Sequence, residues 1–226
     1  MYLPGSMMPG ASGVRELSFL QIPTTGNMAY VDDNINRTTY TFSNVPVGAA
    51  SSNRFIILVC GADNVGSIRS LAAAPTCNGS NMTLVHAIGS ASDGVEGVMY
   101  YTKLTTGTTA EFIITWSAAM GDCGIGIYAV TSSTGNMSVR ASSTSTSGTL
   151  TSVVAARGDV IIGVDVENGG SGALMSWTNS SEAFTTVIAN DNIVSSYEGV
   201  TGPVTRTQAA SPSSGDHASI MAAFQP

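Results

Sequence analysis

Short apolar runs with a period of two recur along the chain from residue 28 onwards, separated by clusters of Gly, Asn, Ser and Asp. In residues 159–167, Val160, Ile162 and the two valines that follow at the same spacing face one way, and Asp165 faces out. Residues 111–116 alternate in the same manner. Because successive side chains of a strand point to opposite faces, this period predicts strands. No window of 11 or more residues holds a helical apolar stripe, and we predict an all-β fold.

A second kind of run is apolar without interruption. After Arg54, residues 55–59 read Phe-Ile-Ile-Leu-Val, which predicts a strand covered on both faces. Many short strands between turn residues are typical of an antiparallel β-sandwich, jelly-roll-like in its connections, which we expect over residues 28–226. Residues 131–148 are rich in Ser, Thr and Gly. They are either a linker between two halves or a long loop across one sandwich, and the chain length of a Greek-key sandwich favours the loop.

Residues 1–27 are predicted to form an extended N-terminal arm. Its first 13 residues combine Met, Pro and Gly without any period, which is typical of an unpacked segment. The arm is either a disordered tail or a segment that a neighbouring subunit orders. Apolar Leu3, Met7 and Met8 favour the second interpretation and are our candidate assembly contacts. We expect no signal peptide, because no positive region followed by an apolar one is present.

The chain carries little charge. Charged residues make up 10% of it, against the usual quarter, and Ser and Thr occupy roughly a quarter of the positions. A hydroxyl costs far less to bury than a charged group, so this surface suits extensive neutral contacts within an assembly. The net charge is −7 and Lys103 is the only lysine, which argues against nucleic acid as a partner. No apolar run approaches the length of a membrane helix.

Metal and cofactor sites are not expected. The three cysteines show no CxxC spacing; Cys60 and Cys123 lie in apolar runs and are predicted core residues, whereas Cys77 is placed in a loop. Residues 32–34, Asp-Asp-Asn, offer oxygen ligands for calcium but lack the spacing of a calcium loop. The glycine run of residues 121–126 leads into a strand and not into a helix, unlike a dinucleotide-binding motif.

No catalytic residues are predicted, and we expect the protein not to be an enzyme. The only histidines are His86, in a probable strand, and His217, at the start of the last strand. Asp216 adjoins His217, but strand neighbours point to opposite faces, so the pair cannot act as a Ser-His-Asp relay. Residues 157–159 spell the adhesion tripeptide Arg-Gly-Asp, for which a turn before a buried strand is the favoured interpretation.

Aromatic residues give one candidate binding surface. Trp116 and Trp177 alternate with apolar residues and are predicted to be in the core. Tyr100 and Tyr101 must point to opposite faces of a sheet, so one of them is expected on the outer surface. We treat these two tyrosines as candidate surface contacts.

The order of these features resembles a known class of protein. An Arg-led apolar strand at residues 54–60 is followed by Tyr-Tyr, a Gly-Thr-Thr turn and a Phe-Ile-Ile-Thr-Trp strand. Gly-Ile-Tyr-Ala-Val-Thr, a Ser/Thr stretch, Gly-Asp-Val-Ile-Ile-Gly-Val, a Trp-bearing strand at residues 174–178 and a terminal Ala-Ala-Phe come next. Over residues 35–226 the chain resembles the β-sandwich structural proteins of tailed bacteriophage particles, which include capsid decoration (cement) proteins and some tail components.

The resemblance implies a virion protein that assembles in the host cytoplasm and has no catalytic residues or cofactor. A capsid decoration protein would bind the major capsid protein and neighbouring copies of itself, and threefold capsid positions favour a trimer. Its arm would cross to an adjacent subunit and add contacts. A tail, neck or fibre component and a carbohydrate-binding adhesion module remain alternatives; the latter would place Tyr100 or Tyr101 in its site.

Overall fold

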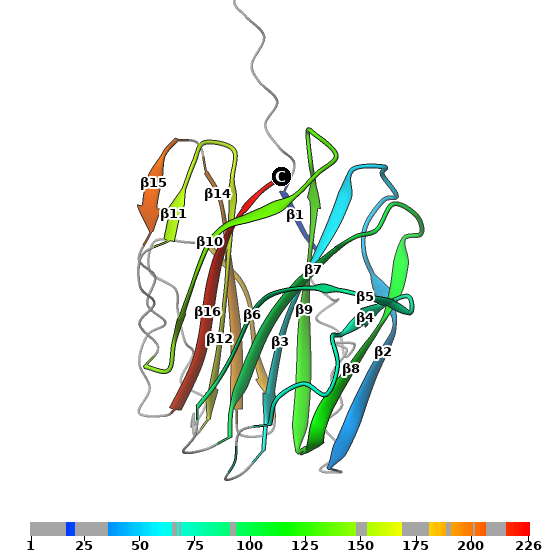
Figure 1. Cartoon of the computed structure of the whole chain (residues 1–226), viewed down its shortest axis with the longest axis vertical. Helices are drawn as coiled ribbons and strands as arrows, with labels where there is room; N and C mark the ends of the chain where they lie inside the picture. The colour runs from blue at the N-terminus through cyan, green and yellow to red at the C-terminus, as the bar shows by residue number, and fades with distance from the viewer. Residues whose placement is uncertain are drawn as a thin grey trace, which may run out of the picture.

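The computed structural model describes residues 17–20, 36–64, 67, 69–90, 94–147, 153–168, 181–188, 191–200, 202–206 and 216–226. These residues form sixteen β-strands and no helix, so the predicted all-β fold is confirmed (Figure 1). The part of the chain that the structure describes therefore has no helix able to cross a membrane.

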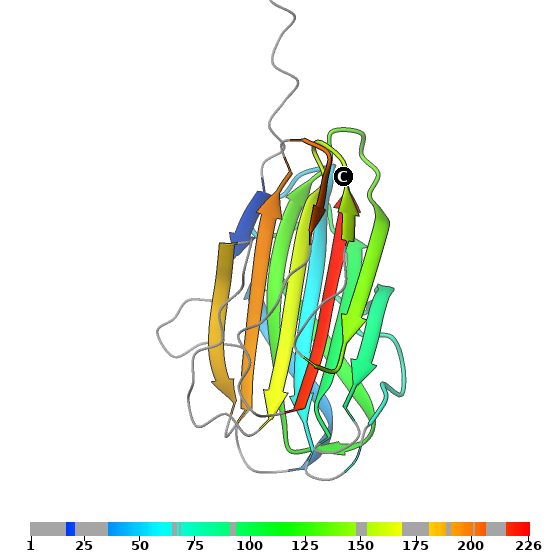
Figure 2. The ribbon, with the colours of Figure 1, turned by 90° about the vertical axis from the view of Figure 1, so that its left-hand side faces the viewer.

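The strands form three larger antiparallel sheets and a small one, and the predicted β-sandwich is confirmed. The central sheet has the order β1 (Leu17–Leu20), β9 (Asp122–Thr131), β3 (Arg54–Asp63), β7 (Glu96–Lys103), β6 (Thr83–Gly89). The second sheet, seen face-on in Figure 2, has the order β10 (Ser138–Ser145), β16 (Asp216–Gln225), β12 (Val160–Asn168), β14 (Asp191–Gly199), β13 (Ser181–Ile188).

The third sheet has the order β2 (Arg37–Pro46), β8 (Thr109–Met120), β4 (Thr76–Cys77), β5 (Ser80–Asn81). The small sheet pairs β11 (Val153–Ala155) with β15 (Val204–Arg206). In Figure 1 the second, central and third sheets follow one another from left to right.

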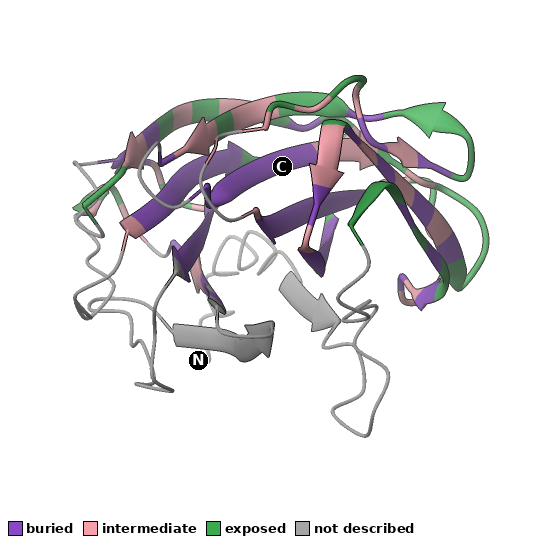
Figure 3. Cartoon of the chain, turned by 90° about the horizontal axis from the view of Figure 1, so that it is seen from below, coloured by how far each residue is buried: buried purple, intermediate pink, exposed green. Residues whose placement is uncertain are grey.

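The central sheet is covered on both faces. Ile56, Leu58 and Cys60 of β3 belong to the core that it shares with the third sheet, which we call the first core. Ile57 and Val59 belong to the core that it shares with the second sheet, the second core. All ten residues of β3 are buried, which confirms that the uninterrupted apolar run is covered on both sides. Figure 3 shows the buried residues on the inner strands and exposed ones on the outer strands.

The second sheet also has two buried faces. Val160, Ile162 and the valines that continue their row on β12 point into the second core, as predicted. Ile161 points the other way and packs with β11 and β16 in a third, smaller apolar cluster. Asp165 shares that opposite face, but its exposed fraction is 0%. The prediction that Asp165 points out to the surface is therefore wrong, because this face is covered too.

Two segments of predicted loop or arm contain strands. Ser138–Ser145, inside the Ser/Thr stretch of residues 131–148, form β10, which pairs with β16. The prediction of a long loop there is wrong for these residues. Leu17–Leu20, inside the predicted arm, form β1 at the edge of the central sheet. Leu3, Met7 and Met8, the Asp-Asp-Asn run of residues 32–34 and Trp177 lie outside the described residues.

Arg54 is a buried charge at the start of β3. Its side chain is 2% exposed, and its guanidinium nitrogens lie 2.7 to 3.0 Å from six backbone carbonyl oxygens, those of Val47, Gly48, Ala49, Leu104, Thr106 and Gly107. Burial lowers the pKa of this guanidinium. β-Sheet pairing leaves these carbonyl groups, which come from two loops, without a donor. The planar guanidinium of Arg54 donates to them and so fixes both loops to the central strand β3.

The close approach of the central and second sheets generates a prediction. A Cβ added at Gly97 of β7 would lie 2.8 Å from the backbone oxygen of Ala218 in β16, and backbone does not yield as a side-chain end does. We expect Gly97→Ala to lower the free energy of unfolding in urea by about 1 to 3 kcal/mol. Gly199→Ala is the matched control, because nothing lies within 4 Å of its Cβ position, and it should change the value by less than about 0.5 kcal/mol. Equal effects of the two substitutions would contradict the packing.

Candidate functional site

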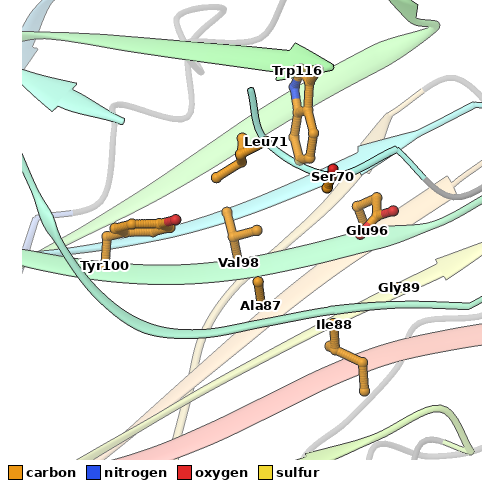
Figure 4. A pocket seen from close by; sticks show the side chains of 9 residues that line it. All are labelled: Ser70, Leu71, Ala87, Ile88, Gly89, Glu96, Val98, Tyr100 and Trp116. Atoms are coloured by element: carbon orange, nitrogen blue, oxygen red, sulfur yellow. The ribbon is translucent and has the colours of Figure 1, made fainter. Parts of the chain in front are cut away.

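A pocket of about 300 Å³ lies between the central and third sheets. Its lining comes from β6, β7, β8 and the chain segment just before β4: Ser70, Leu71, Ala87, Ile88, Gly89, Glu96, Val98, Tyr100 and Trp116 (Figure 4). In Figure 4, Tyr100, Val98 and Glu96 rise from β7 toward Leu71, Ser70 and Trp116 on the opposite side, whereas the side chain of Ile88 points away. A concave, mostly apolar site with a few polar groups is the usual form of a small-molecule site.

Backbone pairing builds the wall opposite β7. The amide of Ala72 donates to the Thr115 carbonyl at 2.8 Å, and the amide of Ser117 donates to the Ser70 carbonyl at 2.8 Å. Leu71 is thereby bridged to Trp116 in an antiparallel arrangement. This short segment places Ser70 and Leu71 over β8, and the alternation of β8 turns Trp116 inward.

Glu96 is the buried carboxyl group of the pocket. It is 4% exposed and lies over Gly89 of the neighbouring strand, where an added Cβ would stand 2.6 Å from Oε2. Its Oε1 accepts a hydrogen bond from the backbone amide of Arg69 at 2.7 Å. Burial raises the pKa of Glu96 to about 7, and the Arg69 amide offsets part of that rise. The carboxyl group therefore exchanges its proton near neutral pH.

Two aromatic side chains carry further polar groups. Trp116 is 1% exposed, which confirms its predicted place in the core, and its buried Nε1 has no hydrogen-bond partner among the described residues. Tyr100 is 6% exposed and belongs to the first core. Burial raises the pKa of its hydroxyl. A buried indole N–H without an acceptor among the described residues is costly to the folded state.

The two predicted surface tyrosines do point to opposite faces of β7. Tyr101 packs against the second core, with its ring 6.1 Å from that of Phe224 in an edge-to-face arrangement. Tyr100 is buried and Tyr101 is half-buried, so Tyr101 is the one of the pair that keeps part of its surface exposed. Tyr100 nevertheless lines the pocket.

A second group of polar residues is buried on the far face of the second sheet. His217 Nδ1 lies 2.9 Å from Asp165 Oδ2, and the Ser219 hydroxyl donates to Asp165 Oδ1 at 2.5 Å. In a Ser-His-Asp relay the histidine lies between the carboxylate and the hydroxyl. Here the carboxylate lies between the other two, so Ser219 is not activated by His217. The arrangement joins β12 to β16 and is a structural network.

His217 thus pairs with Asp165 on the adjacent strand. His86 lies in β6, as predicted, and its Nδ1 accepts from the amide of the next residue, Ala87, at 3.1 Å. Neither histidine lines the pocket.

The cysteines and acidic residues form no metal site within the described ranges, where no group of three or more His, Cys, Asp or Glu side chains could hold an ion. Cys60 and Cys123 are buried as predicted, with their sulfur atoms 3.5 Å apart, and the thiols are free. Cys77 is also buried, in the short strand β4, so its prediction as a loop residue is wrong. The strand that carries Cys77 pairs with β8 in the third sheet.

Two sequence motifs have structural roles. Residues 122–126 of the glycine run lie inside strand β9, so the run belongs to a strand and not to a turn before a helix. In the Arg-Gly-Asp tripeptide, Asp159 is 2% exposed, Gly158 has a φ of 86°, and the Asp159 carboxylate accepts from the Ala156 amide at 2.8 Å. The predicted turn before β12 is therefore present, and the Asp159 carboxylate forms a hydrogen bond within that turn.

No known protein family, curated protein or solved structure was found to match the chain. The assignment of a function rests on the residues and their geometry.

Glu96 generates a pH prediction. Its pKa rises from 4.5 to about 7 on folding, so the folded state binds this proton more tightly than the unfolded state does. The stability that Glu96 contributes is fully present below its unfolded pKa and is lost as the pH rises through its folded pKa. The loss is on the order of 3 kcal/mol.

We therefore expect the free energy of unfolding of the wild type, relative to Glu96→Gln, to fall between about pH 4.5 and 7 and to level off above that range. The glutamine keeps the acceptor for Arg69, so the comparison isolates the charge. Urea unfolding across the pH range measures this difference. A difference that is constant with pH would contradict the raised pKa.

Proposed function

We propose that the protein is a virion structural protein, of the capsid decoration kind, which binds a phage head through a broad uncharged surface. The observation that carries this proposal is the burial of charge. Of the 23 Lys, Arg, Asp and Glu residues, at least seven are buried: Arg54, Asp63, Glu96, Asp122, Asp159, Asp165 and Glu167. These seven charged groups are withdrawn from the surface, whereas a free monomer usually keeps its charge outside for solubility.

The outer face of the third sheet illustrates such a surface. Thr39, Thr41 and Ser43 of β2 are exposed on it, and Thr115 of β8 lies beside Thr39, with their hydroxyl oxygens 3.5 Å apart. Arg37 and Glu111 are the only charged residues of these two strands. Hydroxyl groups lose little on burial against a partner that offers hydrogen bonds, so a large contact here needs no charge pairing.

Repetition on a lattice supplies the affinity that one modest neutral contact lacks. A decoration protein meets the major capsid protein at many equivalent positions, and linked copies bind with a high effective concentration. We propose a trimer at threefold positions, with the part of the arm that precedes β1 reaching a neighbouring subunit through Leu3, Met7 and Met8. A tail, neck or fibre component is the alternative.

Co-sedimentation with undecorated capsid shells of the same virus tests the proposal. We expect saturable binding that changes little between about 0.1 and 0.5 M salt, because screening acts on charge pairs and not on hydroxyl contacts. Removal of residues 1–13 should weaken it. Absence of binding by the full chain, or binding that salt abolishes, would contradict a neutral capsid interface.

A lysine scan of the exposed threonines locates the interface. Thr41→Lys places an ammonium group on the outer face of the third sheet and should weaken binding to shells at least tenfold, because that charge must be desolvated. Thr83→Lys on the edge strand β6 is the matched control and should leave binding unchanged. If the two variants bind alike, the third sheet is not the contact.

A further inference from the structure

We propose that Cys60 and Cys123 form a redox modification site, at which a small disulfide such as oxidised glutathione joins strands β3 and β9 through a disulfide bond. The position of the two thiols, the backbone between them and their burial support this proposal. It goes beyond the capsid interface proposed above and does not depend on it, because the site lies inside the first core.

The two thiols already lie against each other. Cys60 is opposite Ile125 and Cys123 is opposite Ala62, so the cysteines occupy diagonal positions on neighbouring antiparallel strands. Both side chains point into the first core, and their sulfur atoms are 3.5 Å apart. A disulfide bond is about 2.05 Å long, so the sulfur atoms need to approach by about 1.5 Å. Rotation of the two unbranched side chains about χ1 supplies part of that approach.

The backbone between the cysteines supplies the rest of the approach. Diagonal positions are farther apart than directly opposed ones, and a disulfide needs Cα atoms within about 7 Å of each other. Gly61 follows Cys60, Gly124 follows Cys123, and the two glycines are opposite each other. Because glycine has no Cβ, its backbone adopts conformations that are closed to other residues. The shift that brings the strands together therefore falls at the one pair of the β3–β9 ladder in which both residues are glycine.

Burial determines how the bond forms. Both cysteines are 0% exposed, and burial raises the pKa of the Cys60 thiol well above its usual value. Only a thiolate attacks a disulfide, so the exchange begins when the central sheet opens locally and one thiol reaches solvent. That thiolate displaces one glutathione and forms a mixed disulfide, and the second cysteine then displaces the other glutathione. In total, two protein thiols become one disulfide and one oxidised glutathione becomes two reduced ones.

The bond connects two strands on which the whole fold is built. Cys60 and Cys123 are 63 residues apart along the chain, so the disulfide closes a long loop and restricts the unfolded state. Once the core has closed again, burial also keeps reductants away from the bond. A reducing cytoplasm keeps such a pair as thiols, whereas oxidising surroundings convert it. The site therefore adds stability in oxidising surroundings and leaves the strands unlinked in reducing ones.

Counting the thiols after oxidation tests the site. The full-length protein is incubated with oxidised glutathione in urea below its unfolding transition, then denatured in excess N-ethylmaleimide and weighed by mass spectrometry. We expect the number of bound maleimides to fall from three to one, and an unlabelled oxidised sample to weigh about 2 Da less than the reduced protein. Trypsin leaves each cysteine in a peptide of its own, and the linked peptides should be residues 55–69 and 104–140.

Alanine variants separate the pair from the third thiol. Cys60→Ala should keep two reactive thiols after oxidation. Cys77→Ala is the matched control, because Cys77 is also buried in the first core, and its reactive thiols should fall from two to none. Oxidation should raise the melting temperature of the wild type and of Cys77→Ala by roughly 5 to 15 °C, and it should leave that of Cys60→Ala unchanged.

Any one of three results would overturn the proposal. The first is a wild-type chain that still binds two or three maleimides after oxidation in urea, because the second exchange step has then not taken place. The second is a link that includes the peptide of Cys77 in place of the proposed pair. The third is a linked protein that melts at or below the melting temperature of the reduced one, because the bond would then not stabilise β3 and β9.

Discussion

The rest of the structure depends on the burial of the central sheet from both sides. β3 and β9 alternate their side chains between two apolar cores, so each strand holds the second sheet on one face and the third sheet on the other. Gly97 allows the backbone of β7 to approach Ala218, and Arg54 fixes two loops to the start of β3. The pocket follows from the same arrangement, because it forms where β6 and β7 face β8 and the segment that carries Leu71.

Layering also decides where the charges lie. A chain with three stacked sheets has few strand faces left for solvent, so acidic residues such as Asp165 and Glu96 are enclosed together with apolar neighbours. The cost of burying these two carboxyl groups is offset in different ways. Asp165 accepts from Ser219 and adjoins His217, whereas Glu96 is held by one backbone amide and shifts its pKa instead. What remains outside is largely hydroxyl-bearing, and this is the property on which the proposed assembly role rests.

The sequence predicts the strands whose apolar residues reveal their period, and it does less well elsewhere. The apolar run after Arg54 predicts strand β3 and the burial of both its faces, and the alternation of residues 159–167 predicts strand β12. β10 escapes prediction because its residues are mostly Ser and Thr, and its pairing with β16 is set by the partner strand. The pairing of His217 with Asp165 depends on register, and the pocket depends on Trp116 and Glu96 meeting across two sheets, which no local pattern encodes. Tyr100 is the one predicted contact residue that the pocket retains, although it is buried and not on the outer surface.

Double coverage of the central sheet is tested most directly by Ile56→Ala and Ile57→Ala, compared by urea unfolding. The two residues are adjacent, identical in type and fully buried, and they point into the first and second cores respectively. The account predicts that each substitution lowers the free energy of unfolding by about 2 to 5 kcal/mol, because each leaves a cavity in a different core. If either one changes it by less than about 1 kcal/mol, that face of β3 is not covered, and the layered architecture is contradicted.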